Sequence, residues 1–208
     1  MPDLLARGVE LLRYHADRRF LMFEEYVARM LARALVGTGR QVVAQGGRLY
    51  CLESGDGAKL FQTKPDILIK RDGAVELVID TKWKRIARRI DDPKQGVAQA
   101  DIYQMMAYGR LYQCPRLMLL YPHHQALGEA AVRVAHRIAI DACNDRLELA
   151  TIDVATGEGM ADRLRELCTD VKPIPGRRRR QLCKQSFARL HGTWRSRIAP
   201  RSWQRQKP

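Results

Sequence analysis

The feature that most constrains the fold is a pair of apolar segments joined by Asp72-Gly73. Residues 65–71 and 75–83 are both rich in the side chains that favour buried strands. Asp-Gly between two such segments is a strong signal for a hairpin with a two-residue turn. The sequence therefore predicts an antiparallel pair of strands near the middle of the chain.

The segments around this pair predict a layered α/β fold. A helix is expected over residues 3–35, with an apolar stripe from Phe20 to Leu35 and a stop at Gly37-Thr38-Gly39. Residues 41–51 alternate loosely around Gly46-Gly47 and predict another short hairpin. Further helices are expected at residues 97–113 and 158–170, and further strands at residues 116–121, 131–140 and 146–152. Because a hairpin sits among alternating strands and helices, we expect a mixed sheet.

The net charge of +14 is concentrated in the C-terminal part of the chain. Residues 172–208 contain 12 basic side chains and no acidic one. This segment includes the run Arg177, Arg178, Arg179 and Arg180. We therefore expect a folded domain at residues 1–171 and a basic tail at residues 172–208. Such a tail suggests binding to a polyanion, most often nucleic acid.

Composition also excludes several classes of protein. The five cysteines form no C-x-x-C pair, which argues against a disulfide framework and a zinc site and indicates a reducing compartment. No apolar run approaches 18 residues, and the N-terminus has no signal-peptide pattern. The chain also contains no G-x-x-x-x-G-K-[ST] loop for a nucleotide. A cytoplasmic protein with no membrane contact is the expectation.

Asp66, Asp80 and Lys82 form the most informative group of polar residues. Asp80 and Lys82 are two positions apart on a predicted strand, so their side chains point to the same face. Asp66 opens the partner strand, and the turn brings it to the same end of the hairpin. Two carboxylates and a lysine can therefore converge there. The hard carboxylate oxygens suit Mg²⁺, which would polarise a phosphate oxygen and acidify a bound water. The alternative is a partly exposed Asp–Lys pair on an edge strand.

Glu24 falls inside the apolar stripe of the first helix, whereas its neighbour Glu25 lies about 100° away from it. An acid on the buried face is interpreted as a further carboxylate directed at the metal site. The alternative is a carboxylate at the boundary of the buried face.

Gln104 and Tyr108 lie one turn apart on the flank of the helix expected at residues 97–113. At this spacing both side chains can reach a phosphate or orient a metal ligand. The alternative is the ordinary polar flank of an amphipathic helix.

These motifs, taken in order, resemble the PD-(D/E)xK nuclease superfamily and its Q-x-x-x-Y motif. The finer pattern is similar to that of the McrC nuclease subunits of McrBC 5-methylcytosine-specific restriction systems. It is carried by Phe23-Glu24-Glu25-Tyr26-Val27, Lys64-Pro65-Asp66, Val78-Ile79-Asp80-Thr81-Lys82-Trp83-Lys84 and Asp101-Ile102-Tyr103-Gln104 with Tyr108. The resemblance covers residues 20–122.

The resemblance implies a restriction-endonuclease-like fold and Mg²⁺-dependent hydrolysis of DNA phosphodiesters, with Mn²⁺ as a substitute. It implies that Asp66, Asp80 and Glu24 bind metal and that Lys82 orients or activates the attacking water. Gln104 and Tyr108 would support the DNA or the site. Apart from the resemblance, Lys84 and the tail arginines are candidates for DNA contacts because of their charge. A GTPase partner of the McrB type and a dimer are further expectations. A non-catalytic nucleic-acid-binding module and a DNA-repair or recombination nuclease of the same superfamily remain alternatives.

Overall fold

The computed structural model describes residues 21–86, 96–128, 131–139, 145–154 and 159–169. The basic tail with Arg177, Arg178, Arg179 and Arg180 lies outside the described residues, as does the domain boundary expected at residue 171. None of the helices in the described ranges has the length and apolarity that crossing a bilayer requires.

A six-stranded mixed sheet forms the centre of the described part, with the strand order β1-β4-β5-β6-β8-β7. Its strands are β1 (Arg40–Ala44), β4 (Ile67–Arg71), β5 (Ala74–Thr81), β6 (Arg116–Pro122), β7 (Arg133–Arg137) and β8 (Arg146–Ile152). The pairs β5–β6 and β6–β8 are parallel. The pairs β1–β4, β4–β5 and β7–β8 are antiparallel.

The predicted hairpin over residues 65–83 is confirmed. Asp72 and Gly73 have φ angles of 51° and 80°. Two successive residues in the left-handed region match the twist of the flanking strands, which is why Asp-Gly is favoured there. β4 and β5 consequently pair along their length, with Ile67 opposite Ile79.

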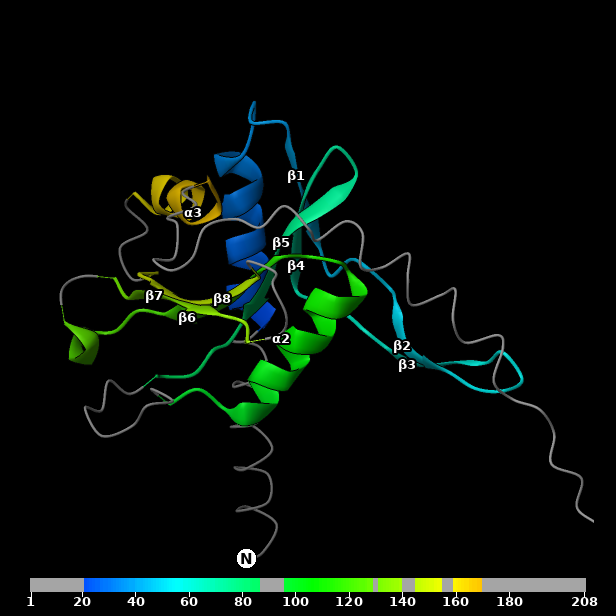
Figure 1. The fold of residues 1–208 in the computed structure, drawn as a ribbon. Helices are drawn as coiled ribbons and strands as arrows, with labels where there is room; N and C mark the ends of the chain where they lie inside the picture. Colours follow the sequence, from blue (N-terminus) through cyan, green and yellow to red (C-terminus); the bar gives the residue numbers. More distant parts are fainter. Residues whose placement is uncertain (1–20, 87–95, 129–130, 140–144, 155–158, 170–208) are drawn as a thin grey trace, which may run out of the picture. The chain divides into compact units, whose positions relative to one another are not determined.

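Helices cover both faces of the sheet, as Figure 1 shows. The N-terminal helix, described over residues 21–34, and α3 (Met160–Thr169) bury side chains such as Val27 and Leu164 against Ile67 and Ile79. On the opposite face, α2 (Gln99–Leu111) and the short 3-10 helix η1 (Gln125–Leu127) contribute to a second cluster. Because side chains alternate along a strand, each face of β4 and β5 supplies one of these two cores.

The hairpin predicted at residues 41–51 is wrong. Val42 and Val43 belong to β1, which pairs with β4 rather than with the segment after Gly46-Gly47. That segment enters a separate two-stranded sheet made of β2 (Tyr50–Glu53) and β3 (Lys59–Gln62). The loose alternation of residues 41–51 therefore reflects two strands that belong to different sheets.

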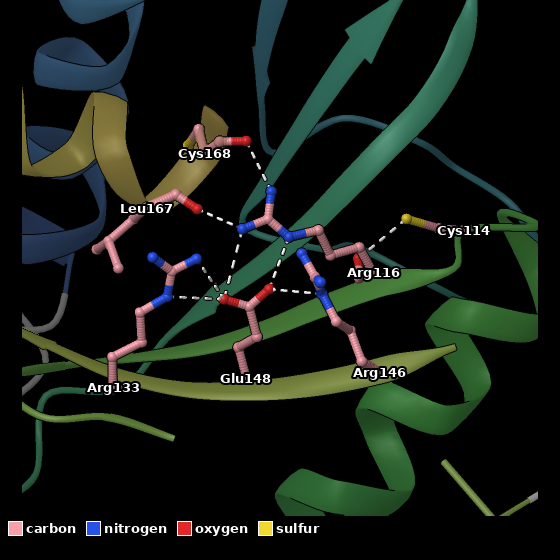
Figure 2. A network of polar contacts seen from close by, with 7 residues as sticks. All are labelled: Cys114, Arg116, Arg133, Arg146, Glu148, Leu167 and Cys168. Carbon is pink, nitrogen blue, oxygen red and sulfur yellow. Dashed lines mark hydrogen bonds and ion pairs between the residues drawn. The ribbon is translucent and has the colours of Figure 1, made fainter. Parts of the chain in front are cut away.

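A buried ionic network joins three strands to α3 (Figure 2). Oε1 of Glu148 lies 2.6 Å from Nε of Arg116 and 2.9 Å from Nε of Arg146. Oε2 of Glu148 lies 3.1 Å from Nη2 of Arg133. Arg116 also donates to the backbone carbonyls of Leu167 and Cys168 in the last turn of α3. One carboxylate thus ties together β6, β7 and β8, and Arg116 satisfies carbonyls at a helix C-terminus.

The architecture agrees with the expected fold class. A mixed α/β arrangement with a central mixed sheet between helical layers is consistent with a restriction-endonuclease-like fold.

Candidate active site

The turn between β4 and β5 brings Asp66 and Asp80 to the same end of this strand pair. Asp66 directly precedes β4, and Asp80 is the residue before the last one in β5. The register of Ile67 opposite Ile79 makes the two acidic residues neighbours across the pair. By strand alternation Asp80 lies on the α2 side of the sheet, the side of Val78.

Asp66 is anchored to the end of β5 by two hydrogen bonds. Its Oδ2 accepts from the backbone N–H of Thr81 at 2.7 Å and from Oγ1 of Thr81 at 2.8 Å. Burial raises the pKa of Asp66, the hydrogen bonds from Thr81 lower it, and the charge of Glu24 adds to the increase. The two Thr81 donors fix this carboxylate in place.

Asp80 is buried, with 1% of its surface exposed. Burial and the neighbouring charge of Asp66 raise the pKa of Asp80 to about 6, although Lys82 opposes the shift. Nζ of Lys82 lies 2.6 Å from Oδ2 of Asp80, which is an ion-pair distance. Within the described part of the chain, the same oxygen has no hydrogen-bond donor in suitable geometry. The ammonium group of Lys82 is therefore the contact that compensates this buried oxygen in the described part of the chain.

Lys82 is held by side chains from both β5 and α2. Besides Asp80, it meets Oε1 of Gln104 at 3.2 Å and Oδ1 of Asp101 at 3.7 Å. Burial lowers the pKa of Lys82, but the bond to Asp80 and the charges of Asp80, Asp101 and Asp66 raise it above its ordinary value. The ammonium group is consequently retained and has a defined position.

Gln104 links Lys82 to Tyr108. Its Oε1 accepts from Lys82, and its Nε2 donates to the hydroxyl of Tyr108 at 2.8 Å. The alternative of an ordinary polar flank does not describe Tyr108, which is 5% exposed and belongs to the core beneath α2. Burial is the first cause that raises the pKa of Tyr108, and the Gln104 bond opposes it.

Asp101 is a member of the site that the sequence did not single out as a candidate. It forms ion pairs with both Lys82 and Lys84, at Oδ1 and Oδ2 respectively. The only sequence signal was its place in the same motif as Gln104. Lys84, two residues after Lys82, is therefore linked to the site through its ion pair with Asp101.

Tyr121, at the end of β6, was also missed. Its hydroxyl is buried and has no hydrogen-bond partner among the described residues. Burial raises the pKa of Tyr121, with smaller contributions from the charges of Asp101 and Asp80. The signal available in the sequence was a tyrosine at the end of an otherwise aliphatic strand.

Glu24 is buried, as its helical phase predicts, with 5% of its surface exposed. Glu25 is exposed and forms an ion pair with Arg29 at 2.6 Å. Glu24 belongs to the helix on the opposite face of the sheet from α2, and its charge acts on Asp66. Across the described ranges, no group of three or more His, Cys, Asp or Glu side chains is arranged as a set of metal ligands. The structure therefore brings together Asp66, Asp80 and Lys82, with Glu24 at longer range.

The residues present fit a hard divalent cation. Mg²⁺ is usually bound by one or two carboxylates and completes its coordination with water and substrate phosphates. Asp66 and Asp80 supply two adjacent carboxylates, and among the described residues the buried Oδ2 of Asp80 is approached by the ammonium group of Lys82 without regular hydrogen-bond geometry. A cation at this position would offset the mutual repulsion that raises the pKa of Asp80.

The class defined by this arrangement is a mixed α/β domain with a carboxylate pair and a lysine at one end of its sheet. Residues 21–122 match the model of a family described as McrBC 5-methylcytosine restriction system component. This segment contains every residue of the site described above. A comparison with curated proteins found no match. The family match supports a role in a restriction system of the McrBC type.

Proposed function

We propose that this chain is a Mg²⁺-dependent DNA endonuclease of the PD-(D/E)xK superfamily and acts as the McrC-type nuclease component of a restriction system. The observation that carries the proposal is the convergence of Asp66, Asp80 and Lys82 at one end of β4 and β5. Acidic side chains repel DNA phosphates, so a binding-only module has no need of them at such a site. The family match favours restriction over a role in repair or recombination.

In this proposal Asp66 and Asp80 hold the metal ion, and Glu24, whose negative charge acts on Asp66, adds to the attraction for the cation. The bound ion supplies Lewis acidity toward a phosphate oxygen and lowers the pKa of a coordinated water. Lys82 orients the attacking water through its ammonium group. Gln104 and Asp101 keep that group in place, since each contacts it directly. Tyr108 in turn positions Gln104.

The proposed biological setting includes a GTPase partner of the McrB type. The chain contains no phosphate-binding loop of its own, so a partner would supply nucleotide hydrolysis. Lys84 and the basic tail are proposed to contact the DNA backbone, because lysine and arginine neutralise phosphates.

Cleavage of supercoiled plasmid by the purified protein, in Mg²⁺ and in EDTA, tests this function. The wild type is expected to cut only in Mg²⁺, and Lys82→Ala is expected to lower the rate at least about 100-fold, the range typical of a positioned proton-transfer group. DNA binding in Ca²⁺ should survive this substitution.

The matched control is Glu25→Gln, at an exposed position of the N-terminal helix whose contact is with Arg29. It is expected to cleave like the wild type. Wild-type cleavage by Lys82→Ala, or cleavage that persists in EDTA, contradicts the proposal.

A further inference from the structure

The β2–β3 hairpin exposes apolar side chains that the rest of the described domain does not cover. All eight residues of its two strands are exposed. Large apolar residues in and beside the hairpin include Leu49, Tyr50, Leu52, Leu60 and Phe61, and Phe61 is 71% exposed. An isolated two-stranded hairpin is only marginally stable in water. Contiguous apolar surface of this kind marks an interaction site.

The base of the hairpin is fixed to the domain. Thr63 donates to the carbonyl of Leu49 through its backbone N–H at 2.7 Å and through Oγ1 at 2.8 Å. The hydroxyl of Tyr112, the residue after α2, bonds with Oγ1 of Thr63 at 2.8 Å and with the carbonyl of Gly47. Gly47 has φ of 77°, and a Cβ there would lie 2.5 Å from the Tyr112 ring. The domain therefore presents this hairpin in a defined place (Figure 1).

One face of the hairpin is mostly apolar. The register sets Leu52 opposite Leu60 and Tyr50 opposite Gln62. Since side chains alternate along each strand, Tyr50, Leu52 and Leu60 share this face with Gln62, and Phe61 does not belong to it. Directly paired leucines beside an aromatic ring are typical of a face that packs against protein, since phosphate backbones select basic side chains.

The charges of the hairpin are separated along its length. Exposed Arg48 and Lys64 stand at its base, and exposed Glu53 and Asp56 stand at or beside its tip, where Lys59 lies opposite Glu53. A twofold axis through the middle of β2 would set Arg48 of one copy against the Gly55–Asp56 turn of the other. The hairpin is thus complementary in charge to an antiparallel copy of itself, as an isologous interface requires.

We propose that the apolar face of the β2–β3 hairpin is the surface on which a second copy of this chain docks, with the tip of each hairpin against the base of the other. Asp66 follows β3 by four residues, so docking would place two candidate sites in one particle. That the two sites together cut both DNA strands rests on the proposed function, whereas the docking itself does not.

Sedimentation equilibrium of the full-length, DNA-free protein tests this proposal. The wild type is expected to dimerise, and Leu52→Glu is expected to weaken dimerisation at least 10-fold by placing a charge in the interface. Leu52 is 56% exposed in a single copy, so the variant should still fold and keep the far-UV circular dichroism spectrum of the wild type. Val36→Glu, at a 76% exposed position outside the hairpin, is the matched control and should dimerise like the wild type.

A charge reversal tests the orientation. Arg48→Glu should weaken the dimer, and adding Gly55→Lys should restore it. A Cβ at Gly55 meets no atom within 4 Å, so the second substitution is tolerated locally.

The proposal is overturned by a wild type that stays monomeric, by wild-type dimerisation of Leu52→Glu, or by failure of Gly55→Lys to restore the dimer. A monomeric wild type whose DNA binding is weakened by Leu52→Glu would assign the surface to DNA and also overturn it. None of these measurements depends on cleavage.

Discussion

At the scale of single residues, Asp80 combines burial with an unfavourable charge environment. Its pKa in the folded protein is about 6, raised by burial and by Asp66 from its ordinary value of 3.8. The folded state therefore holds this proton more tightly than the unfolded state does. It follows that the free energy of unfolding decreases as the pH rises from about 4 to about 6, and that the ionised side chain destabilises the fold at neutral pH.

We predict that Asp80→Asn stabilises the protein at pH 7.5. The amide resembles the protonated acid, and the difference in pKa corresponds to a gain on the order of 2–3 kcal/mol. Thermal unfolding of both proteins at pH 7.5 and pH 4.5 measures the effect. The gain should shrink at the lower pH, where Asp80 of the wild type is protonated. A variant that is less stable than the wild type at pH 7.5 contradicts this account.

The sequence predicted part of the site because strand geometry is regular. That Asp66, Asp80 and Lys82 meet at one end of the strand pair follows from a period of two along each strand and from the two-residue turn. The register shift between Ile69 and Lys70, which sets Ile67 opposite Ile79, does not follow from the turn. The buried position of Glu24 follows from helical phase. The contacts of Asp101 with Lys82 and Lys84 were not predictable, because they depend on how α2 packs over the sheet. The burial of Tyr108 was missed for the same reason.

At the scale of elements, the Asp72-Gly73 hairpin was predictable from local turn chemistry, whereas β2 and β3 were not. A strand that is buried on one face can be recognised in the sequence by alternating apolar and polar residues, but every residue of β2 and β3 is exposed. Apolar residues also stand at the intervening positions Cys51 and Phe61, so the period of two is obscured and the pattern over residues 41–51 predicts a single hairpin instead.

The ionic network around Glu148 gives a prediction at this scale. Glu148 is 1% exposed and contacts Arg116, Arg133 and Arg146. Glu148→Gln leaves the three guanidinium groups without their shared carboxylate and should destabilise the protein by about 3–5 kcal/mol. Urea unfolding at neutral pH measures the loss.

The matched control for this prediction is Glu76→Gln. The side chain of Glu76 is 32% exposed, and its ion pair with Arg40 spans 2.8 Å between β5 and β1. Removal of a partly exposed pair should cost no more than about 1 kcal/mol. Equal losses for the two variants would show that Glu148 does not hold β6, β7, β8 and α3 together.

At the scale of the whole molecule, the residues proposed to cleave DNA and most of the basic side chains proposed to bind it lie in different parts of the sequence. Deletion of residues 173–208 removes 11 basic side chains and no acidic one. Each phosphate neutralised contributes about 0.9 to the slope of log affinity against log salt, so about four contacts give a slope of roughly 3–4. The truncated protein should bind all DNA sequences more weakly and with a flatter salt dependence.

Cleavage at low salt should survive this deletion, because Asp66, Asp80 and Lys82 lie in the described domain. Fluorescence anisotropy with a labelled duplex at several salt concentrations measures the slope. An unchanged slope would show that the tail serves another partner.

The central claim is that Asp66 and Asp80 are adjacent in order to hold a divalent cation, rather than to form a structural ion pair with Lys82. Mn²⁺ binding followed by electron paramagnetic resonance tests this claim directly, with the wild type and Asp80→Asn compared at neutral pH. We predict that the wild type binds Mn²⁺ in competition with Mg²⁺ and that Asp80→Asn, although more stable, binds it at least 10-fold more weakly. Equal Mn²⁺ affinity of the two proteins would contradict the account.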